Sequence, residues 1–150
     1  MVRVLVAGVF AALLPFPAVR AGEKADDAKL LQGVWVASSV EVDGQAMPKE
    51  AVERTRFTFK GDKLLVHGDE NAEKAEVECS FKLTAKESPK QLDITTPEGG
   101  GTMLLGIYEV KGDELKLCFR HPKSKGGRPE KFETAADSES TLIVFQRKKK

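Results

Sequence analysis

The chain of 150 residues has few side chains that could act as a nucleophile or bind a transition metal, namely two cysteines and two histidines. A nucleophilic cysteine needs a base close by, and a zinc site needs several cysteine or histidine ligands at short spacings. His67 and His121 stand in no such pattern with Cys79 or Cys118. The sequence therefore predicts no metal site, no catalytic residue and no cofactor, and we expect that the protein is not an enzyme.

A ten-residue pattern occurs twice and could also carry chemistry. FTFKGDKLLV (57–66) returns as YEVKGDELKL (108–117), and both copies contain Lys-Gly-Asp. A phosphate-binding loop needs several glycines that lead into a helix, and a calcium loop needs alternating acidic ligands. Neither copy has these features, whereas glycine and aspartate between two strands are typical of a tight hairpin. We interpret the repeat as two hairpin turns, formed by Gly61, Asp62, Gly112 and Asp113.

Short strands are expected along almost the whole chain, because apolar and polar residues alternate with period two between breaks rich in glycine and aspartate. The predicted strands are 34–42, 55–60, 63–67, 75–84, 91–96, 102–110, 114–120 and 141–147, with a weaker ninth candidate at 130–134. Helix is predicted only for a short lead-in at 26–32 and for 48–54. Nearly every connection is short, which favours an all-β, up-and-down antiparallel β-barrel of about eight strands over a sandwich.

The strand order also assigns the loops to the two ends of this barrel. In a meander every second connection lies at the same end, so both Lys-Gly-Asp turns are expected at one end. The longer connections, 43–54, 68–74, 97–101 and 121–128, are then expected at the other end. Function in such folds usually resides in the longer loops and in the mouth that they frame.

The alternation of side chains separates the two cysteines. It places Cys79 on the apolar face of its strand and Cys118 on the face that it shares with Lys116. Thiols on opposite faces of a sheet meet only where a bulge or a strand end intervenes. The favoured interpretation of Cys79 is a small core residue, and a disulfide is left open as the alternative.

The N-terminus has the pattern of a secretory signal peptide, with Arg3, an apolar run at 4–16 and small residues near Ala21. We assign residues 1–21 to this signal, with cleavage after Ala21 and Ala18 as a rival site, and residues 22–150 to one barrel domain. The apolar run is shorter than the roughly 20 residues that a membrane-spanning helix needs, so we expect no membrane span. The protein is therefore expected to be exported, to the periplasm or outside the cell.

The overall charge is balanced, with 24 Lys and Arg residues against 23 Asp and Glu residues. A nucleic-acid-binding protein normally shows a strong basic excess, so this balance argues against that class. Hydrophobic residues make up 41% of the chain, which is sufficient for the core of a single domain, and we expect a monomer.

The start of the first predicted strand, LQGVW (31–35), resembles the Gly-x-Trp signature of lipocalins. In that superfamily the tryptophan closes the base of the barrel, and a basic residue of the last strand packs across it. The resemblance implies that Gly33, Trp35 and Arg147 form the barrel base here, with the guanidinium stacked on the indole.

A longer series of motifs resembles an uncharacterised lipocalin-like domain family that is abundant in planctomycete bacteria. The matching segments are LQGVW (31–35), VDG (42–44), FTFKGDKL (57–64), LLGIYEV (104–110), DELKLCF (113–119) and RPEKF (128–132). This family implies the lipocalin-like barrel but brings no established activity. The Thr-Asp-Tyr motif of other lipocalins is absent, and Lys111-Gly112-Asp113 stands in its place.

Two functions of different kinds follow from this interpretation. In the first, the barrel binds a small apolar ligand, with Phe59, Phe81, Tyr108 and Leu117 as the predicted lining. In the alternative, the core is solid and the loop end binds protein or cell-envelope material. A pocket on the order of several hundred Å³, opening opposite the Lys-Gly-Asp turns, would favour the first function.

Overall fold

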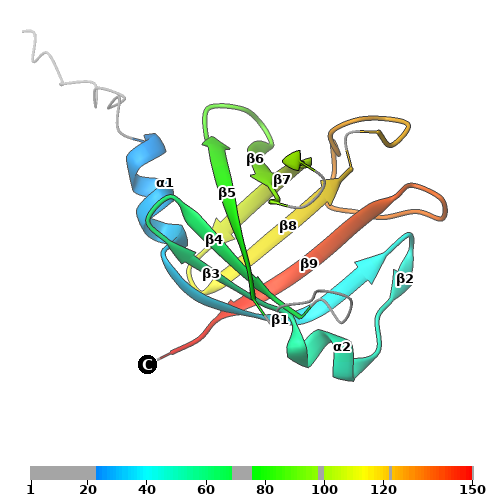
Figure 1. The fold of residues 1–150 in the computed structure, drawn as a ribbon, viewed down its shortest axis with the longest axis horizontal. Coiled ribbons are helices and arrows are strands. Elements are labelled where there is room, and N and C mark those ends of the chain that lie inside the picture. The colour runs from blue at the N-terminus through cyan, green and yellow to red at the C-terminus, as the bar shows by residue number, and fades with distance from the viewer. Residues whose placement is uncertain (1–22, 69–75, 98–99, 122, 150) are drawn as a thin grey trace, which may run out of the picture.

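The computed structural model describes residues 23–68, 76–97, 100–121 and 123–149. The predicted signal peptide at 1–21 lies outside the described residues. Nine strands and two helices are present in the described chain, and they follow each other in the order shown in Figure 1. Their bounds are α1 Glu23–Leu31, β1 Gly33–Val42, β2 Gln45–Ala46, α2 Lys49–Arg54, β3 Arg56–Lys60, β4 Lys63–His67, β5 Glu76–Thr84, β6 Lys90–Thr95, β7 Met103–Lys111, β8 Glu114–Arg120 and β9 Ser140–Arg147.

Eight of these strands form a closed antiparallel barrel, which confirms the predicted fold class. The strands pair in the order β1-β3-β4-β5-β6-β7-β8-β9, and β9 pairs back with β1. The two-residue strand β2 pairs only with the end of β1, at Glu41–Ala46 and Val42–Gln45. The register of β1 against β9 shifts between Ala37 and Ser39, where a bulge increases the bend of the strand. Neither helix in the described chain is long and apolar enough to cross a membrane.

Two details of the prediction were wrong. The segment 130–134 forms no strand, and the strand outside the eight-stranded barrel is β2 instead. The segment lies outside the barrel without pairing as a strand, and its contacts include hydrogen bonds from Sγ of Cys118 to O of Glu133 and from Thr134 to Glu41. The lead-in helix also begins earlier than predicted, at Glu23. The second helix matches its prediction within one residue, with Pro48 at its N-cap.

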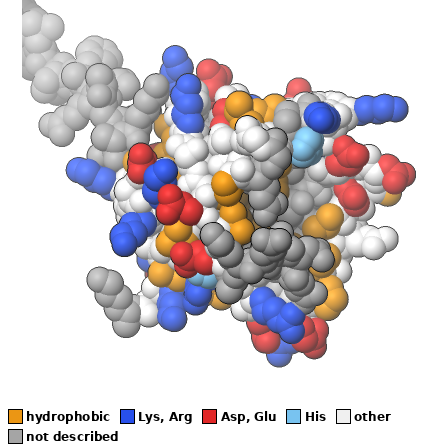
Figure 2. Space-filling view, viewed as in Figure 1, with side chains coloured by type: hydrophobic (Ala, Val, Ile, Leu, Met, Phe, Trp, Pro, Cys, Tyr) orange, Lys and Arg blue, Asp and Glu red, His pale blue; other side chains and the backbone are white. Residues whose placement is uncertain are grey.

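The core consists of the inward-facing residues of the eight strands. They are mostly large, and they include Trp35, Phe57, Phe59, Leu64, Leu92, Ile94, Tyr108, Leu115, Leu117, Ile143 and Phe145. On the outer face shown in Figure 2, acidic and basic side chains are interspersed. The strands thus follow the alternation expected of a sheet with one buried face and one solvated face.

The two ends of the barrel differ, as the meander predicts. Gly61 and Gly112, with φ of 61° and 57°, occupy the turns between β3 and β4 and between β7 and β8, and both turns lie at the end where β1 begins. We call this end the base. The connection from β1 to β3, which contains α2, lies at the other end, which we call the mouth (Figure 1). The predicted loops 68–74 and 97–101 lie partly outside the described residues.

Trp35 and Arg147 close the base. Trp35 is fully buried, its Nε1 donates a 2.8 Å hydrogen bond to O of Leu31, and the guanidinium of Arg147 lies 4.2 Å from the indole centroid. Arg147 also donates hydrogen bonds to O of Gln32 and O of Leu30, at 2.9 Å and 2.5 Å. One cation therefore joins the last strand to the chain that leads into the first strand.

The repeated Lys-Gly-Asp turns take part in this closure. The N–H of Gly61 donates a 2.7 Å hydrogen bond to Oε1 of Gln32, and Nε2 of Gln32 donates a 3.0 Å bond back to O of Gly61. In the second turn, O of Asp113 accepts a 2.7 Å bond from the backbone N–H of Arg147, and the Asp113 carboxylate lies 3.4 Å from Nε of Arg147. Both turns thus form hydrogen bonds or ion pairs with residues next to Trp35, namely Gln32 before it in the sequence and Arg147 stacked on its ring.

Helix α1 packs against the base through a buried carboxylate. Asp27 is only 5% exposed, and its Oδ2 accepts a 2.7 Å hydrogen bond from the Tyr108 hydroxyl and lies 2.8 Å from Nζ of Lys90. Burial, and then the hydrogen bond to Asp27, raise the pKa of Tyr108. A buried carboxylate is tolerated here because Lys90 supplies the opposite charge and Tyr108 a hydrogen bond.

Residues 123–139, in the connection from β8 to β9, cross the outside of the barrel, and we call this segment the strap. Nη1 of Arg128 lies 2.6 Å from Oδ1 of Asp93 in β6 and donates a 2.7 Å hydrogen bond to O of Gly106 in β7. Further along, Oγ1 of Thr134 accepts a 2.9 Å bond from the N–H of Gly44 and donates to the carboxylate of Glu41 in β1. The strap therefore spans the outer faces of the strands from β6 to β1.

Replacing Arg147 tests the closure of the base. We expect Arg147→Ala to lower the free energy of unfolding by on the order of 2 kcal/mol, because a partly desolvated cation–π contact and charged hydrogen bonds are lost. Chemical denaturation followed by Trp35 fluorescence measures the change. Lys148→Ala, which removes an exposed neighbouring charge, is the control and should change stability by less than about 0.5 kcal/mol. Equal stability of the two variants would contradict this role of Arg147.

Candidate functional site

An apolar pocket of about 190 Å³ lies inside the barrel at the mouth. Its wall is made by inward-facing residues of six strands, together with one residue just after β6, and the residues are Phe57, Val66, Val77, Cys79, Ile94, Thr96, Leu104 and Phe119. All but Thr96 are hydrophobic, and those in strands lie in the half of each strand that is nearer the mouth. The barrel is therefore packed solidly toward the base and incompletely filled toward the mouth.

One glycine shapes the wall on the side of β7. A Cβ at Gly106 would lie 2.8 Å from O of Leu92 and 3.2 Å from Cβ of Phe119, so no larger residue fits between the neighbouring strands. Glycine within a strand often marks such a close approach. Gly106 separates Leu104, which lines the pocket, from Tyr108, which belongs to the filled part of the core.

The four residues predicted to bind ligand lie deeper than this pocket. Phe59, Tyr108 and Leu117 are buried in the core, and Phe81 is partly buried with its ring edge-on to Phe59 at 5.1 Å between centroids. None of the four lines the pocket. The hydroxyl of Tyr108 points instead to Asp27 at the base.

The pocket uses the same strands as the prediction, at different positions along them. Phe57, Cys79, Leu104 and Phe119 lie in β3, β5, β7 and β8, two or four residues nearer the mouth than the predicted residues. Period-two alternation gives the inward face of a strand, but it carries no signal for depth along the barrel. The sequence carried one signal for depth, namely that the residues lining the pocket lie nearer to the longer loops than the predicted residues do.

The pocket has little polar chemistry. Its hydroxyl, Oγ1 of Thr96, donates a 3.3 Å hydrogen bond to O of Thr102. The residues that line it include no aspartate, glutamate, lysine, arginine or histidine. The described residues also contain no group of three or more histidine, cysteine or acidic side chains that could hold a metal ion. The site is suited to contact with an apolar molecule.

The two cysteines are buried on different sides of the sheet and are not joined in a disulfide. Cys79 contributes to the pocket wall, whereas Cys118 lies on the outer side of β8 beneath the strap, where its Sγ donates to O of Glu133 at 3.7 Å. Burial raises the pKa of the Cys118 thiol, which keeps it in its less reactive protonated form. This arrangement follows from the alternation of side chains along each strand.

His67 lies at the mouth end of β4, opposite Glu76 in β5 and Arg56 in β3. Its Nε2 is 2.6 Å from Oε2 of Glu76, and its Nδ1 is buried with no hydrogen-bond partner in the described chain. Burial and the positive charge of Arg56 lower the pKa of His67, against the opposing effect of Glu76. A second proton would have to sit on the buried Nδ1, so the neutral ring is favoured in the folded protein.

These features define the class as a closed eight-stranded β-barrel with an apolar pocket at its mouth. Comparison with known proteins finds no family model, no curated protein and no solved structure that matches the chain.

The environment of His67 makes stability depend on pH in a defined direction. As the pH falls below about 6.5, the unfolded chain binds a proton at His67 before the folded protein does. The free energy of unfolding should therefore fall from pH 7.5 toward pH 5 more steeply in the native chain than in His67→Gln, as measured by urea denaturation. Glu76→Gln should steepen the fall, because Glu76 raises this pKa. Identical pH profiles for the native chain and His67→Gln would refute this assignment.

Proposed function

We propose that the chain is an exported lipocalin-like barrel protein that binds a small apolar molecule in the pocket at the mouth. The observation that carries the proposal is the pocket itself, whose lining is apolar apart from Thr96 and which lies at the end of the barrel opposite the Lys-Gly-Asp turns. An apolar wall forms no hydrogen bonds with water. Replacing water in the pocket by a matching apolar ligand therefore lowers the free energy.

The size of the pocket limits the ligand. A volume of about 190 Å³ is below the roughly 300–1,000 Å³ of pockets that hold drug-sized molecules, and it is smaller than the size expected from the sequence. It is close to the roughly 150 Å³ apolar cavity that binds benzene in another protein. The ligand class that fits is therefore a single aromatic ring or a short aliphatic chain, without a charged group inside the barrel.

Filling the pocket tests this proposal. Toluene and indole should raise the melting temperature of the native chain in a concentration-dependent way, because a ligand that binds only the folded state stabilises it. Val77→Phe places a ring in the pocket and should abolish this increase. Val144→Phe adds the same ring on the outer side of β9 and should leave it unchanged. The proposal fails if neither probe stabilises the native chain or if Val77→Phe responds as the native chain does.

Native mass spectrometry of protein purified from its own host identifies the ligand. A retained molecule of one ring or a short chain, absent from Val77→Phe, is the expected result. If nothing is retained and neither probe binds, the alternative of an interaction module that acts through its loop end is favoured.

A further inference from the structure

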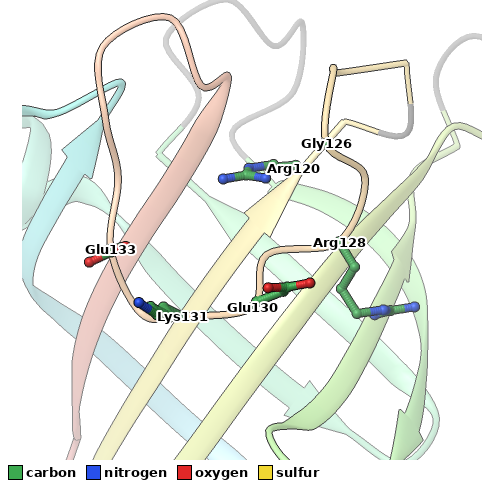
Figure 3. Close-up of a pocket in the computed structure, with 6 residues that line it drawn as sticks. All are labelled: Arg120, Gly126, Arg128, Glu130, Lys131 and Glu133. Atoms are coloured by element: carbon green, nitrogen blue, oxygen red, sulfur yellow. The ribbon is translucent and has the colours of Figure 1, made fainter.

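A second cavity, of about 430 Å³, lies outside the barrel between the strap and β8. It is lined by Arg120 at the end of β8 and by residues of the strap, namely Gly126, Arg128, Glu130, Lys131 and Glu133 (Figure 3). It shares no lining residue with the apolar pocket at the mouth. Its volume lies within the range of roughly 300–1,000 Å³ that is typical of small-molecule sites.

The charges around this cavity fall into two groups. Arg128 is already compensated, because it pairs with Asp93 and donates to O of Gly106. In Figure 3 its side chain points away from the other labelled residues, toward the neighbouring strands. Within the part of the chain that the structure describes, Arg120, Lys131, Glu130 and Glu133 form no ion pair. The cavity wall thus offers the partly buried cation of Arg120 together with the exposed charges of Lys131, Glu130 and Glu133, none of which is paired with another described residue.

Arg120 lies close to the strap and has no charge partner among the described residues. Its Nε is buried and has no hydrogen-bond partner among the described residues, and a Cβ at Gly126 would come within 3.0 Å of its Nη1. Gly126, with φ of 107°, therefore lets the strap approach the guanidinium closely. A partly buried cation without a counter-charge is costly, and a bound carboxylate would offset that cost.

We propose that this cavity binds a small zwitterion of about dipeptide size, with its carboxylate on Arg120 and its ammonium group near Glu130 and Glu133. The lining of two uncompensated cations and two uncompensated carboxylates is neutral in sum, so a ligand that carries both signs is complementary to it. A dianion such as phosphate would pair with the cations but would leave the two glutamates without a positive partner. This site is independent of the apolar pocket proposed above.

Three matched probes separate the two charges of the ligand. Alanylalanine carries both charges, N-acetylalanylalanine only the carboxylate, and alanylalanine amide only the ammonium group. Isothermal titration of the native chain should show the tightest binding for alanylalanine. Arg120→Gln should weaken it by about tenfold or more, as expected for the loss of a charged hydrogen bond. Glu130→Gln combined with Glu133→Gln should remove the preference for alanylalanine over its N-acetyl form.

Controls decide between a ligand site and a structural role. Lys116→Gln removes the same charge from the outer side of β8 and should leave affinity unchanged. Val77→Phe, which fills the apolar pocket, should also leave it unchanged, so failure of one proposal is distinguishable from failure of the other. The proposal is overturned if the native chain does not bind alanylalanine at millimolar concentration, if phosphate binds more tightly, or if Arg120→Gln binds as the native chain does. If Arg120→Gln does not fold, two measurements still distinguish a ligand site from a structural role of Arg120. They are the binding of the three probes to the native chain and to the variant with both glutamates substituted.

Discussion

Pairing of β9 with β1 closes the sheet, and every other feature of the molecule depends on this pairing. An open sheet would leave two edges of unpaired N–H and C=O groups, which invite association with other chains. Closure removes these edges and turns one face of each strand into a common interior. The bulge between Ala37 and Ser39 allows β1 to bend enough to meet both β3 and β9. The core, the base and the mouth all result from this geometry.

The two ends of the barrel are stabilised in different ways. At the base, Trp35 fills the interior, and Arg147 joins the last strand to Leu30 and Gln32. The repeated Lys-Gly-Asp motif serves this closure, because both turns bind residues that flank the tryptophan and both need glycine at positive φ. At the mouth, the side chains that point inward leave a pocket. The base is thus closed by packed side chains and hydrogen bonds, whereas the mouth leaves room for a small apolar molecule.

Much of this fold could be predicted from local patterns. Strand positions, the two hairpin turns and the opposite faces of Cys79 and Cys118 all follow from period-two alternation and turn chemistry, which act over a few residues. The prediction was wrong where contacts are long-range. The segment 130–134 pairs with no strand and instead forms hydrogen bonds with Cys118 of β8 and Glu41 of β1. The extra strand that pairs with β1 is the short β2. Alternation predicts which face of the sheet a residue occupies. It does not predict which other segment of the chain packs against that face.

The sequence by itself determined the class of fold, the number of barrel strands and the end at which the turns lie. Only the tertiary structure decided how deep the barrel is filled, that Phe57 and Leu104 rather than Phe59 and Tyr108 line the pocket, and that the strap forms a second cavity with Arg120. The physical reason is that alternation and turn preference are properties of neighbouring residues, whereas a cavity is the volume left over when side chains from six strands pack together. That remainder depends on closure, on register and on the close approach of strands at Gly106, none of which is encoded locally.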